Sequence, residues 1–414
     1  MKILHVSYSD IKGGAAIASN RLHNGFLKKK FDSWLLVNEK ISNGKKIIGL
    51  NSFCDLFINL IKKLFIKIVN SILRHKIGEF YSLNYFRSNI LKRINLIKPD
   101  IVNLHWINNE MISIEEIAEI RQPFLWTIVD MWPFSGVEHY NQNCNYLKKN
   151  KLSFSAVANR YTLKRKKIFS RCNFEVVSVS NWLTKEAKKS FLFKNKTIHT
   201  IPPGLDFNIW KPINKIKARS DLNLNKKKKY ILFSSANGTG DFRKGFDIFL
   251  KSIDLLKVDK NLLHLIVIGK LDHKNLISNK IKCTEVKKNF FSKSSELVKL
   301  YSACDLLVAP SIYETFGQVV LEAASCNLPV VAFNNTGIVD IIRHKKTGYL
   351  AKFIDIEDFA RGIDWCLNNF KNQRINSKIR SYVRKRFDID SIVEKYESVY
   401  SKILKQNERK IKNI

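Results

Sequence analysis

Cysteine is scarce and without pattern in this sequence of 414 residues. The seven cysteines are odd in number and scattered, and no two of them stand at the C-x₂-C spacing. Disulfide frameworks and structural zinc sites are built from paired or closely spaced cysteines, so the sequence argues against both. The pattern favours a reducing cytosol, and we expect a cytoplasmic protein.

Long hydrophobic runs are also missing. The chain contains no stretch of about 18 apolar residues, the length that predicts a membrane-spanning helix. Lys2 is followed at once by Ile3-Leu4-His5-Val6, which has the pattern of a strand rather than of the apolar core of a signal peptide. We therefore expect neither a transmembrane helix nor a signal peptide.

Acidic residues are few. The 36 aspartates and glutamates are outnumbered by 72 lysines and arginines, which gives a formal net charge of +36. Such a charge favours polyanionic partners, meaning nucleic acid or anionic lipid. The lysines are, however, spread along the whole chain as in a general composition bias, and no nucleic-acid-binding module accompanies them. We expect no nucleic-acid partner.

The chain does have enough apolar sequence for folded domains, since 45% of its residues are hydrophobic, and a chain of this length usually forms two domains. Strand-like apolar runs alternate with helical patterns in two successive series, which predicts parallel sheets. The break falls at Pro202-Pro203-Gly204. We predict an α/β chain with two Rossmann-like domains, at residues 1–205 and 206–387, facing each other across a cleft. A C-terminal helix and basic tail would occupy 388–414.

Residues 305–324 combine the elements of an anion site. An apolar run predicts a buried parallel strand, and a loop with Glu314 and Gly317 then leads into a helix that carries Glu322. A helix N-terminus favours an anion such as phosphate, and glycine lets the backbone approach it closely. Carboxylates on either side could hold hydroxyl groups, as a nucleotide-sugar pocket requires. The alternative is an ordinary strand–loop–helix joint with surface glutamates.

Glycine and polar residues follow three predicted strands of the first domain. Gly13 and Gly14 follow the opening strand, and His105 and Asp130 end two later ones. In open α/β sheets, ligands bind beyond the carboxyl ends of the strands. The glycine pair lacks the full G-x-G-x-x-G pattern and is equally consistent with a tight turn. A lone histidine is also often a structural residue.

Residues 53–74 predict a very apolar helix with one narrow polar stripe, and its lysines are Lys62, Lys63 and Lys67. In one interpretation the helix is mostly buried in the core. In the other it lies on an anionic membrane with its lysines among the lipid headgroups.

Asp388-Ile389-Asp390 is the single D-x-D sequence of the chain. It stands where a last helix, at about 391–404, is predicted to start, which favours helix capping over metal binding. Because the sequence shows no other cluster typical of a metal site, we expect no metal and no other cofactor.

Residues 310–323, in which Glu314 and Glu322 form an E-x₇-E pair, resemble the signature of the retaining nucleotide-sugar glycosyltransferases of the GT-B fold, glycosyltransferase family 4 (group 1). The N-terminal half is similar in particular to enzymes of extracellular and O-antigen-type polysaccharide assembly. The resemblance spans nearly the whole chain. Its further residues are Gly13-Gly14, Leu104-His105-Trp106, 126–136, 178–183, Arg243-Lys244-Gly245, Asn335-Thr336-Gly337 and 346–350.

The resemblance implies a donor site in the second domain. Glu322 would hold the ribose hydroxyls of the nucleotide, Glu314 would lie beside the donor sugar, and Lys244 would neutralise the diphosphate. The implied donor-binding residues are Gly14, Arg243, Lys244, Glu314, Phe316, Gly317, Val319 and Glu322. Gly13, His105 and Asp130 would lie on the acceptor side. The implied catalytic residues are Glu314, Lys244 and Asp130.

The implied activity is the transfer of a hexose from a nucleoside diphosphate sugar to a glycan acceptor, with retention of configuration and without a metal. The acceptor would be lipid-linked, in the synthesis of lipopolysaccharide or exopolysaccharide, and helix 53–74 would contact the inner face of the cell membrane. Two positions depart from the family pattern, because Thr239 replaces the usual arginine and Val129 the usual histidine. The alternatives are a non-catalytic nucleotide-sugar-binding protein and a nucleotide-sugar epimerase of the same fold.

Overall fold

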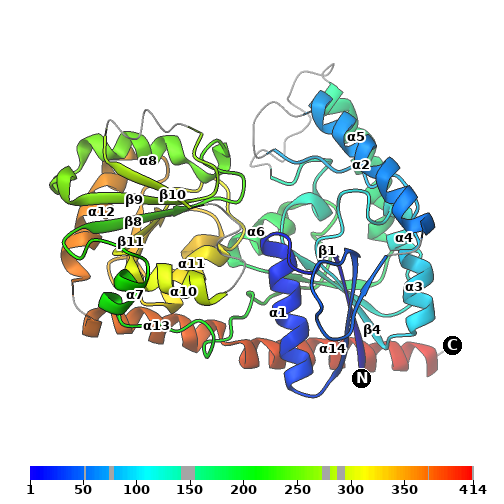
Figure 1. Cartoon of the computed structure of the whole chain (residues 1–414). Coiled ribbons are helices and arrows are strands. Elements are labelled where there is room, and N and C mark those ends of the chain that lie inside the picture. Colours follow the sequence, from blue (N-terminus) through cyan, green and yellow to red (C-terminus); the bar gives the residue numbers. More distant parts are fainter. Residues whose placement is uncertain are drawn as a thin grey trace. The chain divides into compact units, whose positions relative to one another are not determined.

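The computed structural model of the chain describes residues 1–50, 53–73, 79–140, 154–272, 280–286, 294–371 and 373–412. The chain divides into two compact units, each built on one parallel sheet (Figure 1). The first unit consists of Met1–His75, Glu79–Gly204 and Ile389–Ile414, and the second mainly of Leu205–Asp388. The predicted α/β architecture with two Rossmann-like sheets is confirmed. The cleft between them stays a prediction.

The first unit is organised around seven parallel strands in the order β3-β2-β1-β4-β5-β6-β7. The strand order reverses between β1 and β4, and such a reversal opens a crevice for ligands at the carboxyl edge of a sheet. The strands are β1 (Lys2–Ser9), β2 (Asp32–Glu39), β3 (Ile47–Gly49), β4 (Ile101–Leu104), β5 (Phe124–Ile128), β6 (Phe174–Ser178) and β7 (Ile198–Thr200). The helices are α1 (Gly14–Lys28), α2 (Phe53–Leu73), α3 (Ile90–Ile97), α4 (Ile114–Ala118), α5 (Phe154–Lys166), α6 (Asn181–Lys189) and α14 (Ile389–Lys412).

The second unit has six parallel strands in the order β10-β9-β8-β11-β12-β13, and here the order reverses between β8 and β11. The strands are β8 (Lys229–Ser234), β9 (Leu263–Ile268), β10 (Lys282–Val286), β11 (Leu306–Ala309), β12 (Val330–Phe333) and β13 (Gly348–Ala351). The helices are α7 (Lys215–Asp221), α8 (Phe246–Ser252), α10 (Ser294–Ala303), α11 (Gln318–Ser325), α12 (Ile356–Asn369) and α13 (Gln373–Phe387). Short 3-10 turns include η1 (Trp132–Phe134), η3 (Phe242–Lys244) and η7 (Gly337–Asp340).

The strands are nearly continuous apolar runs because helices cover both faces of a parallel sheet. All five residues of β5 and all four of β12 are buried. Strand β10 occupies Lys282–Val286, and residues 287–291 are outside the described part of the chain. Two helices of the first unit begin at serine caps, since Ser113 forms a capping box with Glu116 and the Ser180 side chain accepts from the backbone of Leu183.

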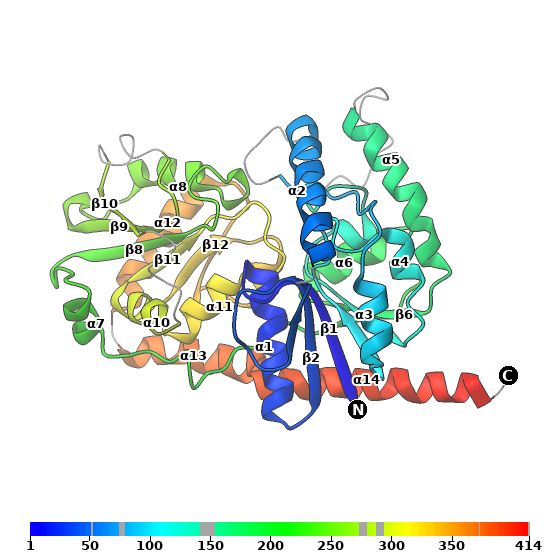
Figure 2. The same cartoon turned by 45° about the vertical axis from the view of Figure 1, so that its right-hand side comes forward.

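The C-terminal helix α14 is part of the first unit (Figure 2). It supplies seven of the fourteen residues of a core cluster that also contains Ile3, Phe26 and Leu125. Gly25 of α1 lets the two helices approach, because a Cβ there would lie 2.7 Å from Val393 Cγ2. The helix also continues to Lys412, well beyond its predicted end near residue 404. Residues 405–412, which belong to the predicted basic tail, are therefore helical.

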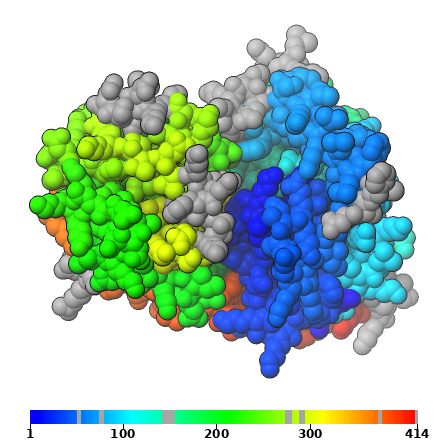
Figure 3. All heavy atoms as spheres, in the orientation of Figure 1, coloured from blue at the N-terminus to red at the C-terminus, as the bar shows by residue number. Residues whose placement is uncertain are grey.

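The orientation of α2 contradicts the interpretation of a mostly buried helix, and membrane contact stays a prediction. Asp55 and Lys62 are buried at 4% exposure, and Asp55 accepts a hydrogen bond from Asn89 Nδ2 at 2.6 Å. The large apolar side chains face outward instead. The segment that contains α2 forms part of the surface seen in Figure 3. Those between 45% and 59% exposed are Leu56, Phe57, Leu60, Ile61, Leu64, Ile68 and Ile72. The expectation of a mostly buried helix is wrong, and so is the placement of Lys62 on an outer surface.

Within the described segments, no helix combines the length and the hydropathy that a membrane crossing would need.

Candidate functional site

The loop between β11 and α11 has the predicted form. It leaves the buried strand at Pro310 and ends at Gly317, which precedes α11 with a φ of +101°. A side chain there would be strained, and its Cβ would lie 3.2 Å from Ile338 Cγ1. The N-cap residue is Gly317, which has no side chain that could cap α11. The positive end of the helix dipole is therefore directed at this loop, which favours an anion.

Glu314 and Lys244 meet beside this helix end although they are 70 positions apart in the sequence. Lys244 Nζ lies 2.5 Å from Glu314 Oε2, and the two side chains are 25% and 20% exposed. Gly245, with a φ of +64°, makes the approach possible, because a Cβ there would lie 2.0 Å from the carbonyl oxygen of Pro310. The structure thus brings together two of the three predicted catalytic residues.

Glu322 lies within α11 and is 6% exposed. Its Oε2 accepts a hydrogen bond from the hydroxyl of Tyr301, on α10, at 3.2 Å. The sequence did not single out Tyr301, whose only signal was its place in an apolar helix. Val319, in the first turn of α11, is half-buried, and Phe316 is buried against Phe387 with ring centroids 5.6 Å apart.

Arg243 is engaged within its own loop. Its Nε and one terminal nitrogen donate to the Asp241 carboxylate at 3.1 and 2.7 Å. Burial opposes ionisation of Asp241, but the hydrogen bond and charge of Arg243 hold the pKa of that carboxyl below its usual value. Thr239, at the position of the family's usual arginine, accepts from the backbone of Asp272 and shapes the same loop. A contact of Arg243 with a donor stays a prediction.

A third loop, after β12, supports the Glu314 loop. The backbone N–H of Gly337 donates to the Glu314 carbonyl at 2.8 Å, and a Cβ at Gly337 would lie 1.9 Å from the Thr315 carbonyl oxygen. Three buried side-chain oxygens at this edge of the sheet have no partner among the described residues. They are Ser235 Oγ, Asn335 Oδ1 and Thr336 Oγ1. Unsatisfied buried groups are costly, so these three oxygens are candidates for contact with a ligand.

In the first unit, Gly13 and Gly14 lie exposed at the start of α1. Gly13 has a φ of +95°, but a Cβ there would meet no atom within 4 Å. The glycine is therefore needed for its backbone conformation, as the tight-turn interpretation requires, and the space beside it is open.

His105 is buried at 4% exposure, and its Nε2 lies 3.0 Å from Nδ1 of the fully buried His5. Burial lowers the pKa of His105 to about 3. The imidazole is therefore neutral at physiological pH and turned toward another side chain, as in a structural residue. Its predicted contact with an acceptor stays a prediction.

Asp130 is buried in a network of neighbouring side chains. Its Oδ2 lies 2.6 Å from His139 Nδ1 and accepts from Trp106 Nε1 at 2.8 Å. His139 Nε2 in turn lies 2.9 Å from Ser82 Oγ. This arrangement orients the half-buried indole of Trp106. A catalytic role of Asp130 stays a prediction. The fully buried Lys166 holds the same loop, because its Nζ donates to the carbonyls of residues 132, 135 and 136.

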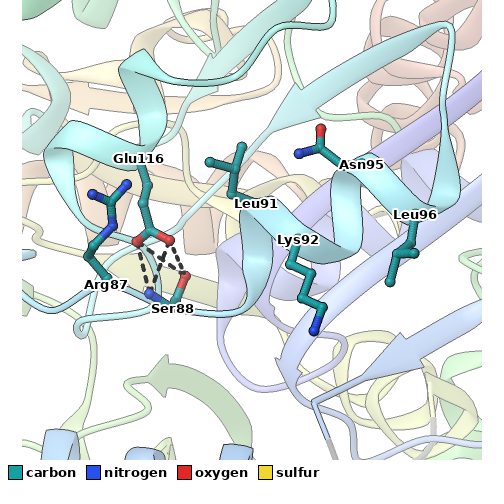
Figure 4. Close-up of a pocket in the computed structure, with 7 residues that line it drawn as sticks. All are labelled: Arg87, Ser88, Leu91, Lys92, Asn95, Leu96 and Glu116. Atoms are coloured by element: carbon teal, nitrogen blue, oxygen red, sulfur yellow. Dashed lines mark hydrogen bonds between the residues drawn. The ribbon is translucent and has the colours of Figure 1, made fainter.

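Two surface hollows of the first unit were not anticipated. One, of about 480 Å³, is lined by Arg87, Ser88, Leu91, Lys92, Asn95, Leu96 and Glu116 (Figure 4). The Glu116 carboxylate in this hollow accepts hydrogen bonds from the backbone N–H groups of Ser88 and of Ser113, the cap of α4. Its contacts therefore have a structural role. The other, of about 440 Å³, is lined by Tyr8, Lys12, Glu39, Lys63, Ile66, Lys67, Trp106 and Asn109. We call the second one the lysine hollow.

Across the described residues, histidine, cysteine, aspartate and glutamate side chains form no group of three or more that could hold a metal ion.

Comparison with solved structures assigns the fold. The chain matches sucrose-phosphate synthase from Thermosynechococcus elongatus with a TM-score of 0.70 over 98% of this chain and all of that one, at 16% identity. It matches Anabaena Alr3699/HepE, solved in complex with UDP, with a TM-score of 0.63 over 97% of this chain and all of that one, at 15% identity. The fold is that of the GT-B glycosyltransferases.

Comparison with protein-family models gives a finer assignment of the class of protein than the fold does. Residues 214–386, within the second unit, match the model of the family "Glycosyl transferases group 1". A 41.2 kDa protein of the cps region of Klebsiella pneumoniae is 24% identical over 97% of this chain and 99% of its own length. The first curated relatives match over shorter stretches, and the chain spans only 45% and 59% of the length of two of them.

Proposed function

We propose that this protein is a glycosyltransferase of surface polysaccharide synthesis, which transfers a hexose from a nucleoside diphosphate sugar to a glycan acceptor with retention of configuration. The observation that carries the proposal is the Lys244–Glu314 pair at the N-terminus of α11. A helix end and a lysine are suited to a diphosphate, and Glu314 and Glu322 are suited to hydroxyl groups. The UDP complex of HepE, a structure of the same fold, supports a nucleotide donor.

In the proposed mechanism, Lys244 exchanges Glu314 for the donor diphosphate, which carries more negative charge than a carboxylate. Glu314 is then available to accept a hydrogen bond from a hydroxyl of the donor sugar. As the glycosidic bond breaks, Lys244 and the dipole of α11 stabilise the leaving diphosphate. The acceptor hydroxyl is held near the anomeric carbon and attacks from the face that the leaving group vacates, and its proton passes to an oxygen of the departing diphosphate. Asp130 contributes by orienting Trp106.

A panel of nucleotide sugars tests the activity. The purified protein should release nucleoside diphosphate from at least one donor when a glycan acceptor is present. Val129, which replaces the family's usual histidine, favours a second candidate, a nucleotide-sugar-binding protein without activity. Tight binding of a nucleotide sugar without release from any donor of the panel would select that candidate.

The replacement Glu322→Ala should weaken nucleotide binding by roughly tenfold, because the ribose hydroxyls lose a charged acceptor. Calorimetric titration with UDP measures the effect. Ser295 lies exposed in the first turn of α10, at the opposite end of that helix from Tyr301, and Ser295→Ala is the control. Unchanged nucleotide affinity in the Glu322 variant would show that the donor is held elsewhere.

We further propose that the acceptor is lipid-linked and that α2 rests on the anionic inner face of the cell membrane. The outward apolar face of α2 supports this, because seven large apolar side chains lie exposed on one helix of the first unit. Lys63 and Lys67 are exposed on the same helix and could meet lipid phosphates.

Replacing Leu60, Leu64 and Ile68 together by serine should lower binding to anionic vesicles by about 100-fold or more, measured by flotation. Full burial of one such side chain contributes about 1.5–3 kcal/mol, so three together exceed the roughly 2.7 kcal/mol that a 100-fold change requires. All three are more than half exposed, so the fold should persist. Ile216→Ser, at a 61% exposed position of the second unit, is the matched control. Equal flotation of the triple variant and the control would refute the membrane contact.

A further inference from the structure

The lysine hollow is formed at the carboxyl edge of the first sheet. Tyr8 belongs to β1, Glu39 ends β2, and Trp106 follows β4, next to the reversal of strand order. Lys63 and Lys67 reach the hollow from α2, which stands beside the end of β1 (Figure 2). Ligand sites of open α/β sheets lie at this edge.

The charges lining the hollow are unbalanced. Lys12, Lys63 and Lys67 face a single carboxylate, that of Glu39. Glu39 Oε1 lies 2.8 Å from Lys63 Nζ, and Oε2 lies 3.4 Å from Lys12 Nζ. The Tyr8 hydroxyl also donates to Oε1, at 3.2 Å. One carboxylate therefore bridges two lysines, and the hollow keeps an excess of positive charge that suits an anion of higher charge.

Partial burial would raise the pKa of Glu39, but the hydrogen bond of Lys63 and the charges of Lys12 and Lys63 hold it below its usual value. The Glu39 side chain is 19% exposed, whereas Lys12 and Lys63 are 65% and 51% exposed. The Glu39 carboxylate is therefore more enclosed than the two ammonium groups, and the exposed lysine side chains have room to turn toward a ligand.

The remaining walls suit a sugar ring. The rings of Tyr8 and Trp106 lie nearly at right angles with centroids 5.7 Å apart, and Trp106 is fixed by its hydrogen bond to Asp130. Asn109 offers an amide, and both it and Glu110 have positive φ values, +55° and +57°. Consecutive left-handed residues are strained and persist where the surroundings hold them. Here the Glu110 carboxylate accepts from three successive backbone N–H groups, those of residues 84–86.

We propose that the lysine hollow binds the glycosyl diphosphate end of the acceptor, with the diphosphate on Lys12, Lys63 and Lys67 and the first sugar against Trp106. Glu39 is the internal counter-ion that occupies Lys12 and Lys63 until the diphosphate displaces it. The same exchange of a carboxylate for a diphosphate is proposed for Lys244 in the second unit. This inference rests on the proposed function, because it specifies the acceptor of that reaction.

Calorimetric titration with inorganic pyrophosphate tests the site without requiring catalysis. The Lys244→Gln variant is used as the background, so that binding at the donor site is removed. In it, Lys63→Gln should weaken pyrophosphate binding by about tenfold, and Glu39→Gln should strengthen it several-fold, because the competing carboxylate is neutralised. Lys188→Gln, at an exposed position of α6, should change nothing. The proposal is overturned if pyrophosphate does not bind in this background, if Lys63→Gln leaves binding unchanged, or if Glu39→Gln weakens it.

A phospholipid headgroup carries related chemistry, and vesicles of phosphatidylglycerol distinguish the two sources. If Lys63→Gln weakens vesicle binding but leaves pyrophosphate binding unchanged, the lysines serve lipid headgroups and the proposal is overturned. The proposed function and the proposed site can fail independently of each other. If no donor of the panel is turned over but the pyrophosphate pattern is found, the site stands without the reaction. If transfer occurs but the pyrophosphate pattern is absent, the reaction stands and the site fails.

Discussion

Replacement of Lys244 by glutamine should lower kcat/KM for the donor by about 100- to 1000-fold, the usual effect of removing one preorganised group that stabilises transition-state charge. Lys244 is placed for this role because its ammonium group lies beside Glu314 and the N-terminus of α11. The loss should fall mainly on kcat, since the charge of the leaving diphosphate is greatest in the transition state. Steady-state release of nucleoside diphosphate measures the effect.

Lys251→Gln is the matched control, since Lys251 lies exposed at the end of the neighbouring helix α8. The Lys244–Glu314 pair is partly exposed, so its loss should change the melting temperature little. A Lys244→Gln enzyme that folds and retains the full kcat/KM would mean that other groups carry the leaving-group charge.

Acidification should destabilise the first unit through its buried histidines. Burial lowers the pKa of His105 to about 3. The pKa of His5 is also well below its usual value, mainly because of burial and in addition because of the charges of His105 and His23. In the unfolded chain both titrate near pH 6.5. The unfolded state therefore binds more protons than the folded state between about pH 6.5 and 3. The two histidines contribute their full share to the free energy of unfolding above about pH 6.5, and this contribution is lost as the pH decreases through this window. Each histidine contributes a slope of up to about 1.4 kcal/mol per pH unit.

Urea unfolding at pH 7.5, 6.5 and 5.5, followed by tryptophan fluorescence, measures this slope. Five of the seven tryptophans lie in the first unit, so the signal reports mainly on it. His105→Gln should flatten the pH dependence, whereas His344→Gln, at an exposed position of the second unit, should not. A His105→Gln protein with the slope of the unaltered chain would exclude the histidine pair as its source.

The sequence was informative where local pattern and chemistry coincide. The strand, loop and helix around Glu314 could be predicted because a buried parallel strand needs an apolar run and the loop needs a glycine at positive φ. The contact of Glu314 with Lys244 could not be derived from spacing. It depends on the pairing of β8 with β11, which sequence order does not reveal. For these two residues the prediction came from the family resemblance.

The side of a helix that faces inward could not be predicted from the sequence. Periodicity defines the stripes of α2, but burial of Asp55 and Lys62 depends on charged partners from distant segments. Arg93 lies 3.6 Å from Asp55, and carboxylates such as Glu110 raise the pKa of Lys62 against the effect of burial. The buried partner of His105 was unpredictable for the same reason, since His5 becomes its neighbour only when β1 pairs with β4.

The place of α14 has a consequence for synthesis on the ribosome. The first unit begins at Met1 but takes half of one core cluster from residues that follow Asp388. Domains usually fold in order as the chain emerges. Here the second unit can complete its core while the first still exposes apolar surface around Phe26 and Leu125. Nascent chains interrupted before Ile389 therefore lack part of that core, so they should be recognised by chaperones and degraded.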